Sequence, residues 1–514
     1  MTTSSNKPSR RLLIANRGEI AVRIIRAARD EGWHSIAIYS EADRTAPHAQ
    51  MADEAYPVGP APSHESYLRM DRILAIAEKT GATHIHPGYG FFSENPDFVE
   101  QVEKAGIRMV GPSAAAIRGM GDKVAAREAA EKAEVPLVPG SPPLPADPEV
   151  AVEYAEKIGY PILIKAAFGG GGKGMRLCQD ADDIRSALAL TRGEAGRSFG
   201  NDTVFLERAL LKARHVEIQL LCDEHGNGVH LGERECSIQR RHQKLVEETP
   251  CVVLTPETRA AMGEAAVRLA LNIGYHNAAT VEFLLDADGS FYFLEMNTRL
   301  QVEHPITEAV TRIDIVRAQL KIAEGQPLPF QQDEITRDGH AIECRIIAED
   351  PAAGFLPASG PILWSRLPQG PGIRNDVGFE TGGEVSIHYD SMIGKLIAWG
   401  KDREEARERM LRALDEYLIE GVRTNIDFQR WVLAHPAFIS GDVHTRFVDE
   451  HFEPSMMHSE AKEQELASIA AMAAFRDRTG TVGLRAENRG TTTDDDPAAP
   501  RTSSWKRSET WRGR

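Results

Sequence analysis

The sequence predicts a fold that is α/β in its N-terminal part and α+β in the rest. Three observations support this prediction. Apolar, strand-like segments alternate with amphipathic helices over residues 1–120, a pattern that builds an open parallel sheet. A run of glycines then follows a strand directly, which indicates a glycine-rich lid. Further on, two strand-like segments flank an Asp-Gly turn and predict an antiparallel hairpin within a C-terminal α+β region.

The chain has 514 residues, of which 42% are hydrophobic, so it is long enough for several packed units. Its 76 acidic and 60 basic residues give a net charge of -16, which argues against a nucleic-acid backbone as the main partner. No apolar run approaches the ~20 residues that cross a bilayer, and the polar start does not resemble a secretory signal. The 5 scattered cysteines predict neither a disulfide framework nor a zinc site. We therefore expect a cytoplasmic protein that binds neither nucleic acid nor membrane.

The N-terminal part is predicted to consist of repeated strand–helix units. Strand-like segments are expected at Arg11–Asn16, Ser35–Ser40, Thr83–Pro87 and Ile107–Pro112. Apolar residues at helical spacing predict helices at Glu19–Glu31, near Tyr67–Lys79 and near Asn95–Ala105. Because open parallel sheets bind ligands at the carboxyl ends of their strands, two loops are candidate binding segments: Asn16–Glu19 and His86–Asn95.

The rest of the chain divides where its composition changes. We expect a helix through Gly121–Lys123, a boundary at the proline-rich Val135–Pro148 and a helix near Glu404–Glu416. A further helix is expected at Ser459–Arg478, and the polar segment beyond Thr479 is predicted to be disordered. The predicted segments are residues 1–120 (parallel sheet), 121–203 (linker helices and lid), 204–330 (body with metal and catalytic residues), 331–452 (C-terminal domain) and 453–514 (helix and tail).

The glycine run, Phe168 to Gly174, follows the strand-like segment Ile162–Lys165. Backbone N–H groups without neighbouring Cβ atoms can close on phosphate oxygens, so we interpret the run as a mobile lid over a nucleotide, with Lys165 as a phosphate ligand. The run matches neither a P-loop nor a GxGxxG dinucleotide turn. A flexible surface linker is the alternative, although linkers rarely separate two strand-like segments.

Acidic and amide side chains recur with period two in FLEMNTRLQVEHP. If this segment stays extended, one of its faces carries Glu295, Asn297, Arg299, Gln301 and Glu303. Across the Asp-Gly turn, Glu282 stands among apolar residues, and a register that pairs it with residue 293 or 295 places Glu282 and Glu295 on one face. Such oxygen ligands suit a Mg²⁺ ion that bridges nucleotide phosphates. A solvated polar face is the alternative.

Basic side chains mark three further places. Residues 239–244 are all basic or nitrogen-bearing and are bracketed by acids, which is compatible with a small-anion site, although a solvated face is the usual interpretation of such a run. His215 precedes a strand-like segment and by itself is more typical of a structural histidine. Arg345 lies within an apolar strand-like run, so its burial would require an ion pair or a ligand anion as partner.

Taken together and in their order, these motifs resemble the biotin carboxylases. The matching segments are NRGEIAVRIIRAA, HPGYGFFSEN, GDK, IKAAFGGGGKGM, ECSIQRRHQK, VEFL, EMNTRLQVEHPITE and ECRIIAED, and they cover about Arg10 to Phe452. The resemblance implies an ATP-grasp fold. It also implies a ligase that converts ATP, bicarbonate and biotin into carboxybiotin, ADP and phosphate, with Mg²⁺ or Mn²⁺ as the metal.

The resemblance also implies roles for individual residues. The expected catalytic groups are the general base Glu303, the cations Arg299 and Lys244 beside bicarbonate, and Arg345 facing the biotin enolate. The expected metal ligands are Glu282, Glu295 and Asn297. The expected ATP ligands are Lys123, Lys165, His215 and the backbone of Gly171 and Gly172, with adenine against Glu207, Arg208, Ala209, Leu210 and Leu284. His242 and Lys244 resemble phosphate and bicarbonate ligands, Gln301 and Val302 belong to the bicarbonate cradle, and Tyr89 is expected to border the biotin site.

The chain carries no Met-Lys-Met type of biotin acceptor, since Met456-Met457 is followed by His458. Biotin is therefore expected on a separate biotin carboxyl carrier protein, with carboxyltransferase subunits elsewhere, and the resemblance implies a homodimer. Acetyl-CoA carboxylase is the expected context, ahead of propionyl-CoA or pyruvate carboxylase. Two alternatives stay open: another ATP-grasp ligase of the carbamoyl-phosphate type, and a catalytically dead assembly subunit that has lost a metal or base residue.

Overall fold

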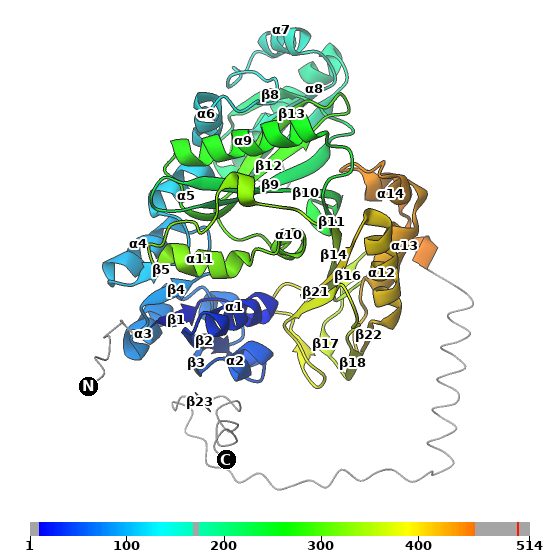
Figure 1. Ribbon diagram of the computed structural model, residues 1–514. Coiled ribbons are helices and arrows are strands. Elements are labelled where there is room, and N and C mark those ends of the chain that lie inside the picture. Colours follow the sequence, from blue (N-terminus) through cyan, green and yellow to red (C-terminus); the bar gives the residue numbers. More distant parts are fainter. Residues whose placement is uncertain (1–9, 168–173, 458–500, 503–514) are drawn as a thin grey trace, which may run out of the picture.

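The computed structural model describes residues 10–167, 174–457 and 501–502 of the chain. Its N-terminal part is a sheet in the order β23-β3-β2-β1-β4-β5 (Figure 1). All pairs among the first five strands are parallel, whereas β23 (Arg501–Thr502) is antiparallel to β3. Those five strands are β1 (Arg11–Ile14), β2 (His34–Ser40), β3 (Glu54–Gly59), β4 (His84–His86) and β5 (Arg108–Met109). The predicted open parallel sheet is therefore confirmed.

Helices cover both faces of this sheet. On one face α1 (Gly18–Asp30) shares an apolar core with α11 (Ile315–Ala323), and on the other face lie α3 (Met70–Thr80) and α4 (Pro96–Lys104). These strands and helices agree with the predicted ones, with ends that differ by a few residues. The prediction lacks β3 and the short α2 (Pro47–Met51). β3 contains Pro57, which is tolerated there because proline fits near the edge of a sheet, where fewer ladder hydrogen bonds are needed.

Two helices, rather than the single predicted one, surround Gly121–Lys123. Helix α5 (Ala114–Gly121) ends there, and α6 (Lys123–Lys132) begins after a change of direction at Asp122. The Asp122 carboxylate accepts hydrogen bonds from the backbone N–H groups of Val124 and Ala125, both at 2.9 Å, so it caps the second helix. The predicted continuous helix is wrong because this capping aspartate starts a new one.

A small unit between the two larger parts carries the expected lid. Its sheet has the order β7-β6-β8, with antiparallel pairs, and helices α7 (Pro148–Ile158) and α8 (Ala181–Phe199) pack on it. The strands are β6 (Ile162–Ala166), β7 (Met175–Cys178) and β8 (Val204–Arg208). The proline-rich linker is tied to the body, since Phe293 N–H donates to the Pro136 carbonyl at 2.7 Å. The glycine run at 168–173, including Gly171 and Gly172, lies outside the described residues.

The largest sheet joins the middle of the chain to its C-terminal part. It has the order β13-β12-β9-β10-β11-β14-β21-β19, and its neighbouring strands are antiparallel. The strands are β9 (Arg214–Cys222), β10 (Gly228–Arg240), β11 (Gln243–Thr249), β12 (Asn277–Leu285), β13 (Phe291–Asn297), β14 (His340–Ile347), β19 (Ile373–Val377) and β21 (Met392–Gly400). The β11–β14 pair crosses residue 330, so one sheet serves both predicted segments, 204–330 and 331–452.

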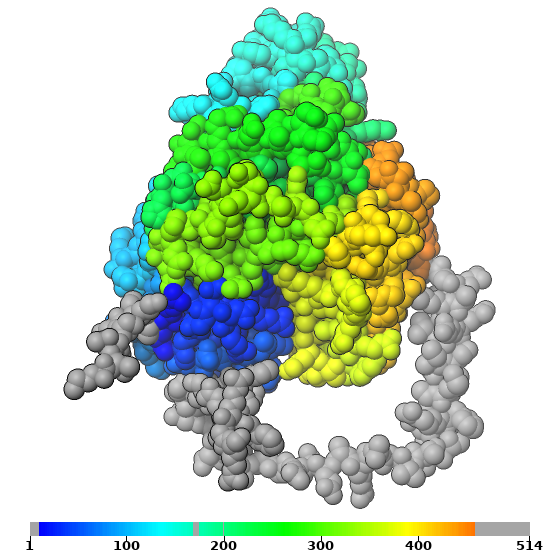
Figure 2. Space-filling model, viewed as in Figure 1, coloured from blue at the N-terminus to red at the C-terminus, as the bar shows by residue number. Residues whose placement is uncertain are grey.

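The two faces of this sheet meet different helices. Helices α9 (Pro256–Asn272) and α12 (Arg403–Glu416) pack on one face with two large apolar cores, and we call this the back face. Helix α10 (His304–Thr311) packs on the other, the front face, with Ala341 and Ile397. Figure 2 shows the lid unit (cyan) at the narrow end of the molecule and the N-terminal (blue) and C-terminal (yellow) parts side by side at the broad end.

Short elements complete the C-terminal part. They are β15 (Glu349–Asp350), β16 (Leu356–Pro357), β17 (Gly360–Pro361), β18 (Trp364–Arg366), β20 (Glu384–Val385), β22 (Leu418–Glu420), α13 (Ile426–Ala434), α14 (Pro436–Ser440) and α15 (Phe447–His451). The helix expected at Ser459–Arg478 lies outside the described residues. All five cysteines are free thiols, as predicted. Within the described residues, no helix combines the length and the apolar character that a membrane crossing needs.

Candidate active site

Buried charges gather on the front face, around the ammonium group of Lys244. Alternation along β9 places His215 and Glu217 on this face, and the strand register sets Glu217 opposite Glu282 of β12. The Lys244 Nζ atom donates to carboxylate oxygens of Glu217 at 2.6 Å, Glu282 at 2.8 Å and Glu303 at 2.7 Å. Burial opposes a charged amine, but the three carboxylates outweigh it and hold the pKa of Lys244 well above its usual value. The ammonium therefore stays charged at neutral pH.

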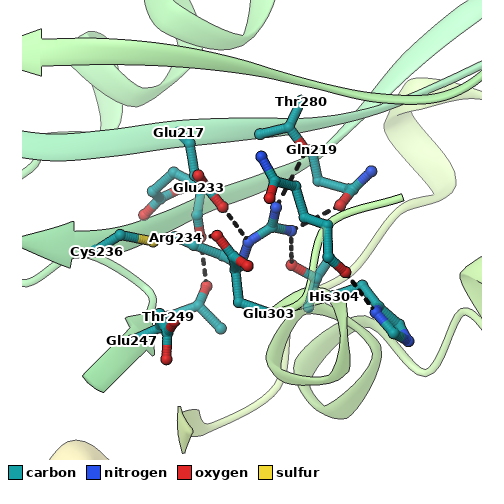
Figure 3. A network of polar contacts seen from close by, with 12 residues as sticks. Glu217, Gln219, Glu233, Arg234, Cys236, Glu247, Thr249, Thr280, Glu303 and His304 are labelled. Carbon is teal, nitrogen blue, oxygen red and sulfur yellow. Dashed lines mark hydrogen bonds and ion pairs between the residues drawn. The ribbon is translucent and has the colours of Figure 1, made fainter. Parts of the chain in front are cut away.

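A second cation, Arg234 of β10, is fully buried, and Figure 3 shows its guanidinium among the side chains of Glu217, Gln219 and Thr280. Its Nε atom donates to Glu217 at 2.6 Å, and its Nη1 atom donates to the side-chain oxygens of Gln219 at 2.7 Å and Thr307 at 3.0 Å. Its Nη2 atom donates to Thr280 Oγ1 at 3.2 Å. Glu217 is thus held between Arg234 and Lys244, and the contact with Thr307 ties the same guanidinium to α10.

Glu303 precedes the first residue of α10 and is fully buried. One of its oxygens accepts the hydrogen bond from Lys244, and the other accepts one from Arg345 Nη2 at 3.0 Å. Arg345 also donates from Nε to Glu247 at 2.6 Å, so of the two expected partners, an ion pair or a ligand anion, the structure shows an ion pair. Burial alone would raise the pKa of Glu303, but Lys244 and Arg345 outweigh it and hold that pKa well below its usual range. Glu303 is therefore a carboxylate, the form that a general base needs.

The hairpin of β12 and β13 brings the predicted metal ligands together. The register pairs Glu282 with Glu295 and Thr280 with Asn297, so of the two registers considered for Glu282, with residue 293 or 295, the second is observed and the two glutamates share one face. Among the described residues, no ion pair or hydrogen bond neutralises the Glu295 carboxylate, and partial desolvation and the Glu282 charge raise its pKa. The buried Asn297 keeps an unpartnered Nδ2 atom, while its Oδ1 atom accepts from Arg299 at 2.7 Å. Two facing carboxylates with an amide oxygen fit a hard divalent cation such as Mg²⁺.

The chain leaves the strand after Asn297, so the extended segment predicted from Glu295 to Glu303 is wrong beyond that point. The polar residues nevertheless converge. Arg299 donates from Nη1 to Gln301 Oε1 at 3.1 Å and from Nε to Glu94 at 2.9 Å, and Gln301 Nε2 donates to Glu282 at 3.2 Å. Glu94 belongs to the predicted loop His86–Asn95, so this loop reaches the site.

The basic run at residues 239–244 does not form a single anion site. Arg240 and Gln243 pair across the turn between β10 and β11, so Arg241 and His242 are its two loop residues, with φ of 49° and 67°. Arg240 points away from the cluster, donates to Glu349 at 2.9 Å and lies 4.1 Å over the Phe355 ring. Only Lys244 enters the charged cluster, while His242 is exposed at the tip of the turn.

The residues expected at the nucleotide lie where the lid unit meets the body. Lys165 of β6 and Arg127 of α6 both contact the buried carboxylate of Glu207, Arg127 at 2.6 Å. Arg208 pairs with Asp286 of the hairpin turn at 2.5 Å. Ala209 is buried, Leu210 is half-buried, and Leu284 shares the front face with His215, opposite which it lies in the register. Lys123 is exposed at the start of α6.

His215 is more than the structural histidine that its surroundings in the sequence indicate. Its Nε2 atom lies 2.9 Å from a Glu282 oxygen, and both side chains are buried. Together with Glu217 these two residues place ligand atoms within 4.8 Å of one another. Lys244 already neutralises two of the three groups, so this trio is a less suitable metal site than Glu282 with Glu295.

Tyr89 and Val302 meet at a further buried cation, Lys395 of β21. Lys395 Nζ donates to the Val302 carbonyl at 2.7 Å and lies 3.2 Å from a Glu19 oxygen, to which the Tyr89 hydroxyl also donates. The Tyr89 ring lies 5.9 Å from the same ammonium. These contacts link the N-terminal loop of Tyr89 to the segment that precedes Glu303.

Sequence reasoning missed seven charged residues in and around this cluster. They are Glu19, Glu94, Glu217, Arg234, Glu247, Glu343 and Lys395. A usable signal existed in HVEIQLL, where His215, Glu217 and Gln219 recur with period two in an otherwise apolar strand. Arg234, which stands between Glu233 and Glu235, and Lys395 gave no such signal, because charged residues in a strand also occur on solvated faces.

A buried acid–base cluster on a large antiparallel sheet, with a small separate three-stranded unit, fits an ATP-grasp type of ligase. The family models agree: residues 8–117 match the biotin carboxylase N-terminal domain, residues 122–331 the carbamoyl-phosphate synthase L chain ATP-binding domain, and residues 343–450 the biotin carboxylase C-terminal domain. The chain belongs to the biotin carboxylase family.

Curated relatives and solved structures agree with this assignment. The chain is 53% identical to a pyruvate carboxylase subunit of Methanothermobacter thermautotrophicus, over 86% of this chain and 90% of that protein. It is 49% identical to biotin carboxylase 1 of Bacillus subtilis, over 86% of this chain and 98% of that protein. The biotin carboxylase domain dimer of Hydrogenobacter thermophilus 2-oxoglutarate carboxylase, solved with MgADP, ADP and bicarbonate, superposes with a TM-score of 0.80 at 45% identity, covering 88% of this chain and 99% of that one.

Proposed function

We propose that this chain carboxylates biotin on a separate carrier protein, with bicarbonate and ATP, as the first half-reaction of acetyl-CoA carboxylase. The observation that carries the reaction is the ionised Glu303 held between Lys244 and Arg345 on a buried face, with the facing pair Glu282 and Glu295 beside it. The family assignment supports the ATP and biotin steps. Every residue implied by the resemblance as base or metal ligand is present, which argues against a dead assembly subunit.

Bicarbonate is a weak nucleophile that must lose its proton as it attacks the γ-phosphorus of ATP. In our proposal the bicarbonate proton moves to Glu303, a bond forms between a bicarbonate oxygen and the γ-phosphorus, and ADP leaves with the bridging oxygen. Lys244 and Arg299 then face the anionic product, carboxyphosphate. Bound bicarbonate interacts with the same cations, which then stabilise the Glu303 carboxylate less. Glu303 is therefore a stronger base when its substrate is bound. Mg²⁺ held by Glu282, Glu295 and Asn297 would neutralise phosphate charge.

Carboxyphosphate breaks into CO₂ and phosphate, and the phosphate takes the N1 proton of biotin. The biotin anion then attacks CO₂ and forms carboxybiotin. Arg345 is the cation that stabilises the enolate-like oxygen of that anion, since its guanidinium is held in place by Glu247 at Nε and by Glu303 at Nη2. Closure of the lid unit would exclude water from these labile intermediates.

The remaining roles in this proposal follow from position. Lys165, Lys123 and His215 bind the phosphates of ATP, together with backbone groups of Gly171 and Gly172, and the segment from Glu207 to Leu210 binds adenine against Leu284. In this structure Lys165 forms an ion pair with the Glu207 carboxylate. If Lys165 binds a phosphate of ATP, this ion pair has to change. His242, at the tip of its turn, Gln301 and Val302 complete the phosphate and bicarbonate sites. Tyr89 borders the biotin site.

A steady-state assay tests the reaction. With Mg²⁺ and ATP, the purified chain should form ADP only when bicarbonate is present, and faster when free biotin is added. Stimulation by ammonia in place of biotin would indicate a ligase of the carbamoyl-phosphate type. ATP hydrolysis that ignores bicarbonate and biotin would contradict the proposal.

The final carboxyl acceptor is a separate part of the proposal. The 53% identity to a pyruvate carboxylase subunit favours pyruvate as a second candidate beside acetyl-CoA, with propionyl-CoA behind. Co-purification should yield a biotinylated carrier and a carboxyltransferase. The reconstituted assembly should then carboxylate acetyl-CoA in preference to pyruvate and propionyl-CoA, and a preference for either of the others would reassign the context. A homodimer is expected in sedimentation.

A further inference from the structure

Two carboxyl groups that the proposed mechanism does not use face each other beside Arg345. Glu247 of β11 and Glu343 of β14 are directly opposite each other in the antiparallel register, and both are fully buried. Directly opposite residues of such a pair have Cβ atoms only about 4.5–5.5 Å apart, with side chains on the same face. The two carboxyl groups are therefore close neighbours inside the protein.

The hydrogen bonds around this pair are unequal. One Glu247 oxygen accepts from Arg345 Nε at 2.6 Å, but the other Glu247 oxygen has no donor among the described residues. Neither oxygen of Glu343 has a donor there. A buried carboxylate without any donor is far less stable than a neutral carboxylic acid. If Glu343 is protonated, its hydroxyl can donate a hydrogen bond to the free Glu247 oxygen.

The nearby cations are already committed to other groups. Arg345 is held by Glu247 and Glu303, and Lys395 is held by Glu19 and the Val302 carbonyl. The charged or titratable groups that act on the pair are Arg345, Lys395, Lys244, Glu303, Tyr89, Cys236 and Cys344. Burial raises the pKa of Glu343 well above its usual range, since the charges of Glu247 and Glu303 reinforce it against Lys395 and Arg345. Burial also raises the pKa of Glu247, to about 7.

We propose that Glu247 and Glu343 share one proton at neutral pH, carried mainly by Glu343, and that this proton fixes Glu247 as the positioning residue of Arg345. With both groups ionised, Arg345 would lie among three carboxylates, and the four groups together would carry two excess negative charges. With one proton held, Glu247 orients the guanidinium, and less negative charge faces the place where substrate anions are expected. The part concerning Arg345 rests on the proposed function, whereas the shared proton does not.

Infrared spectroscopy of the full-length protein in heavy water tests the proton directly. At pH 8 exposed carboxyl groups are ionised, so the carbonyl band of a protonated acid reports buried groups alone. Glu343→Gln should remove intensity from this band, and Glu408→Gln on the exposed side of α12 should leave it unchanged. A band that keeps its full intensity in Glu343→Gln would assign the proton elsewhere and overturn the proposal.

Glu247→Gln provides a second test that does not require the Glu343 variant to fold. Loss of the facing charge should move the titration of the remaining acid band to lower pH by about 1 unit or more, because a like-charged neighbour is gone. An unchanged midpoint would overturn the shared proton.

Kinetics then test the positioning of Arg345 separately. Glu247→Gln should lower kcat/KM for free biotin by about 10- to 100-fold, because a misplaced guanidinium loses its geometry, while bicarbonate-dependent ATP hydrolysis without biotin changes much less. Glu343→Gln should lower kcat/KM for biotin far less than Glu247→Gln does. Equal losses in both activities for Glu247→Gln would contradict a positioning role, and an acid band that behaves as expected in an inactive protein would contradict the proposed function alone.

Discussion

The two faces of the eight-stranded sheet are built from the same strands and differ in almost every property. In β9, Val216, Ile218 and Leu220 point to the back face and join the apolar core beneath α9. Their neighbours His215, Glu217 and Gln219 point to the front face and are just as buried. The back face is stabilised mainly by removing apolar surface from water. The front face instead holds ionisable groups, most of which are buried beside a partner of opposite charge.

This difference separates the face that stabilises the fold from the face that carries the chemistry. A buried ion cluster is weak evidence for stability, since similar apolar groups often serve as well. Its value lies in groups whose charge state and position are fixed before a substrate arrives, as for Glu303 between Lys244 and Arg345. Substitutions on the front face should therefore change the chemistry most, and those on the back face should change stability alone.

The largest effect should come from Glu303→Gln. Removing the base should lower bicarbonate-dependent ADP formation by about 10²- to 10⁴-fold, the range for loss of general base catalysis. The affinity for Mg-ATP, measured by calorimetry, should stay within about twofold, because Glu303 is expected to contact bicarbonate and not the nucleotide. Loss of ATP binding would instead show that the residue is a metal ligand or structural.

Arg234→Met should have the next largest effect, and it tests whether the buried Glu217 depends on a partner of opposite charge. Without the guanidinium, Glu217 keeps only Lys244 as a partner in a fully buried position, which should destabilise the protein by about 3–5 kcal/mol in urea unfolding. Addition of Glu217→Gln should recover part of this loss, since the stranded charge is removed. Equal stability of the single and double variants would contradict the pairing.

The back face also carries buried ion pairs, and the one around Glu248, near the end of β11, should report on acid stability. Burial opposes ionisation of Glu248, but hydrogen bonds from His340 and Arg403 at 2.8 and 2.7 Å outweigh it and lower its pKa to about 2. A depressed pKa gives stability that is present above about pH 4.5 and is lost as the pH falls toward 2. The difference in unfolding free energy between wild type and Glu248→Gln should be about 2–3 kcal/mol at pH 7 and should shrink below pH 4.5. A difference independent of pH would contradict this assignment.

Ile218→Val should have the smallest effect and should leave the chemistry alone. Removal of one methylene from the back-face core should cost about 0.5–1.5 kcal/mol, measured by urea unfolding. The kcat for bicarbonate-dependent ATP hydrolysis should not change, although Ile218 lies next to Glu217 in the strand. A clear loss of kcat would mean that the two faces are coupled.

The sequence predicts more of the fold than of the support for the site. The parallel sheet and the hairpin that pairs Glu282 with Glu295 follow from local patterns of period two and 3.6. The break at Asp122 was missed because a capping aspartate and an exposed helical one look alike in a sequence. Arg234, Glu343 and Lys395 were missed because their burial depends on helices and strands far away in the chain. The roles implied by the resemblance remain predictions until they are tested.

Oxygen-isotope transfer gives the most direct test of the central claim, that the front face activates bicarbonate by attack on ATP. Uniformly ¹⁸O-labelled bicarbonate is supplied with Mg-ATP and biotin, and the phosphate product is examined by mass spectrometry under single-turnover conditions. Attack by bicarbonate predicts one labelled oxygen in each phosphate, since that oxygen stays on phosphorus when carboxyphosphate breaks down. Unlabelled phosphate formed at the same rate would show that water attacks ATP and would contradict the claim.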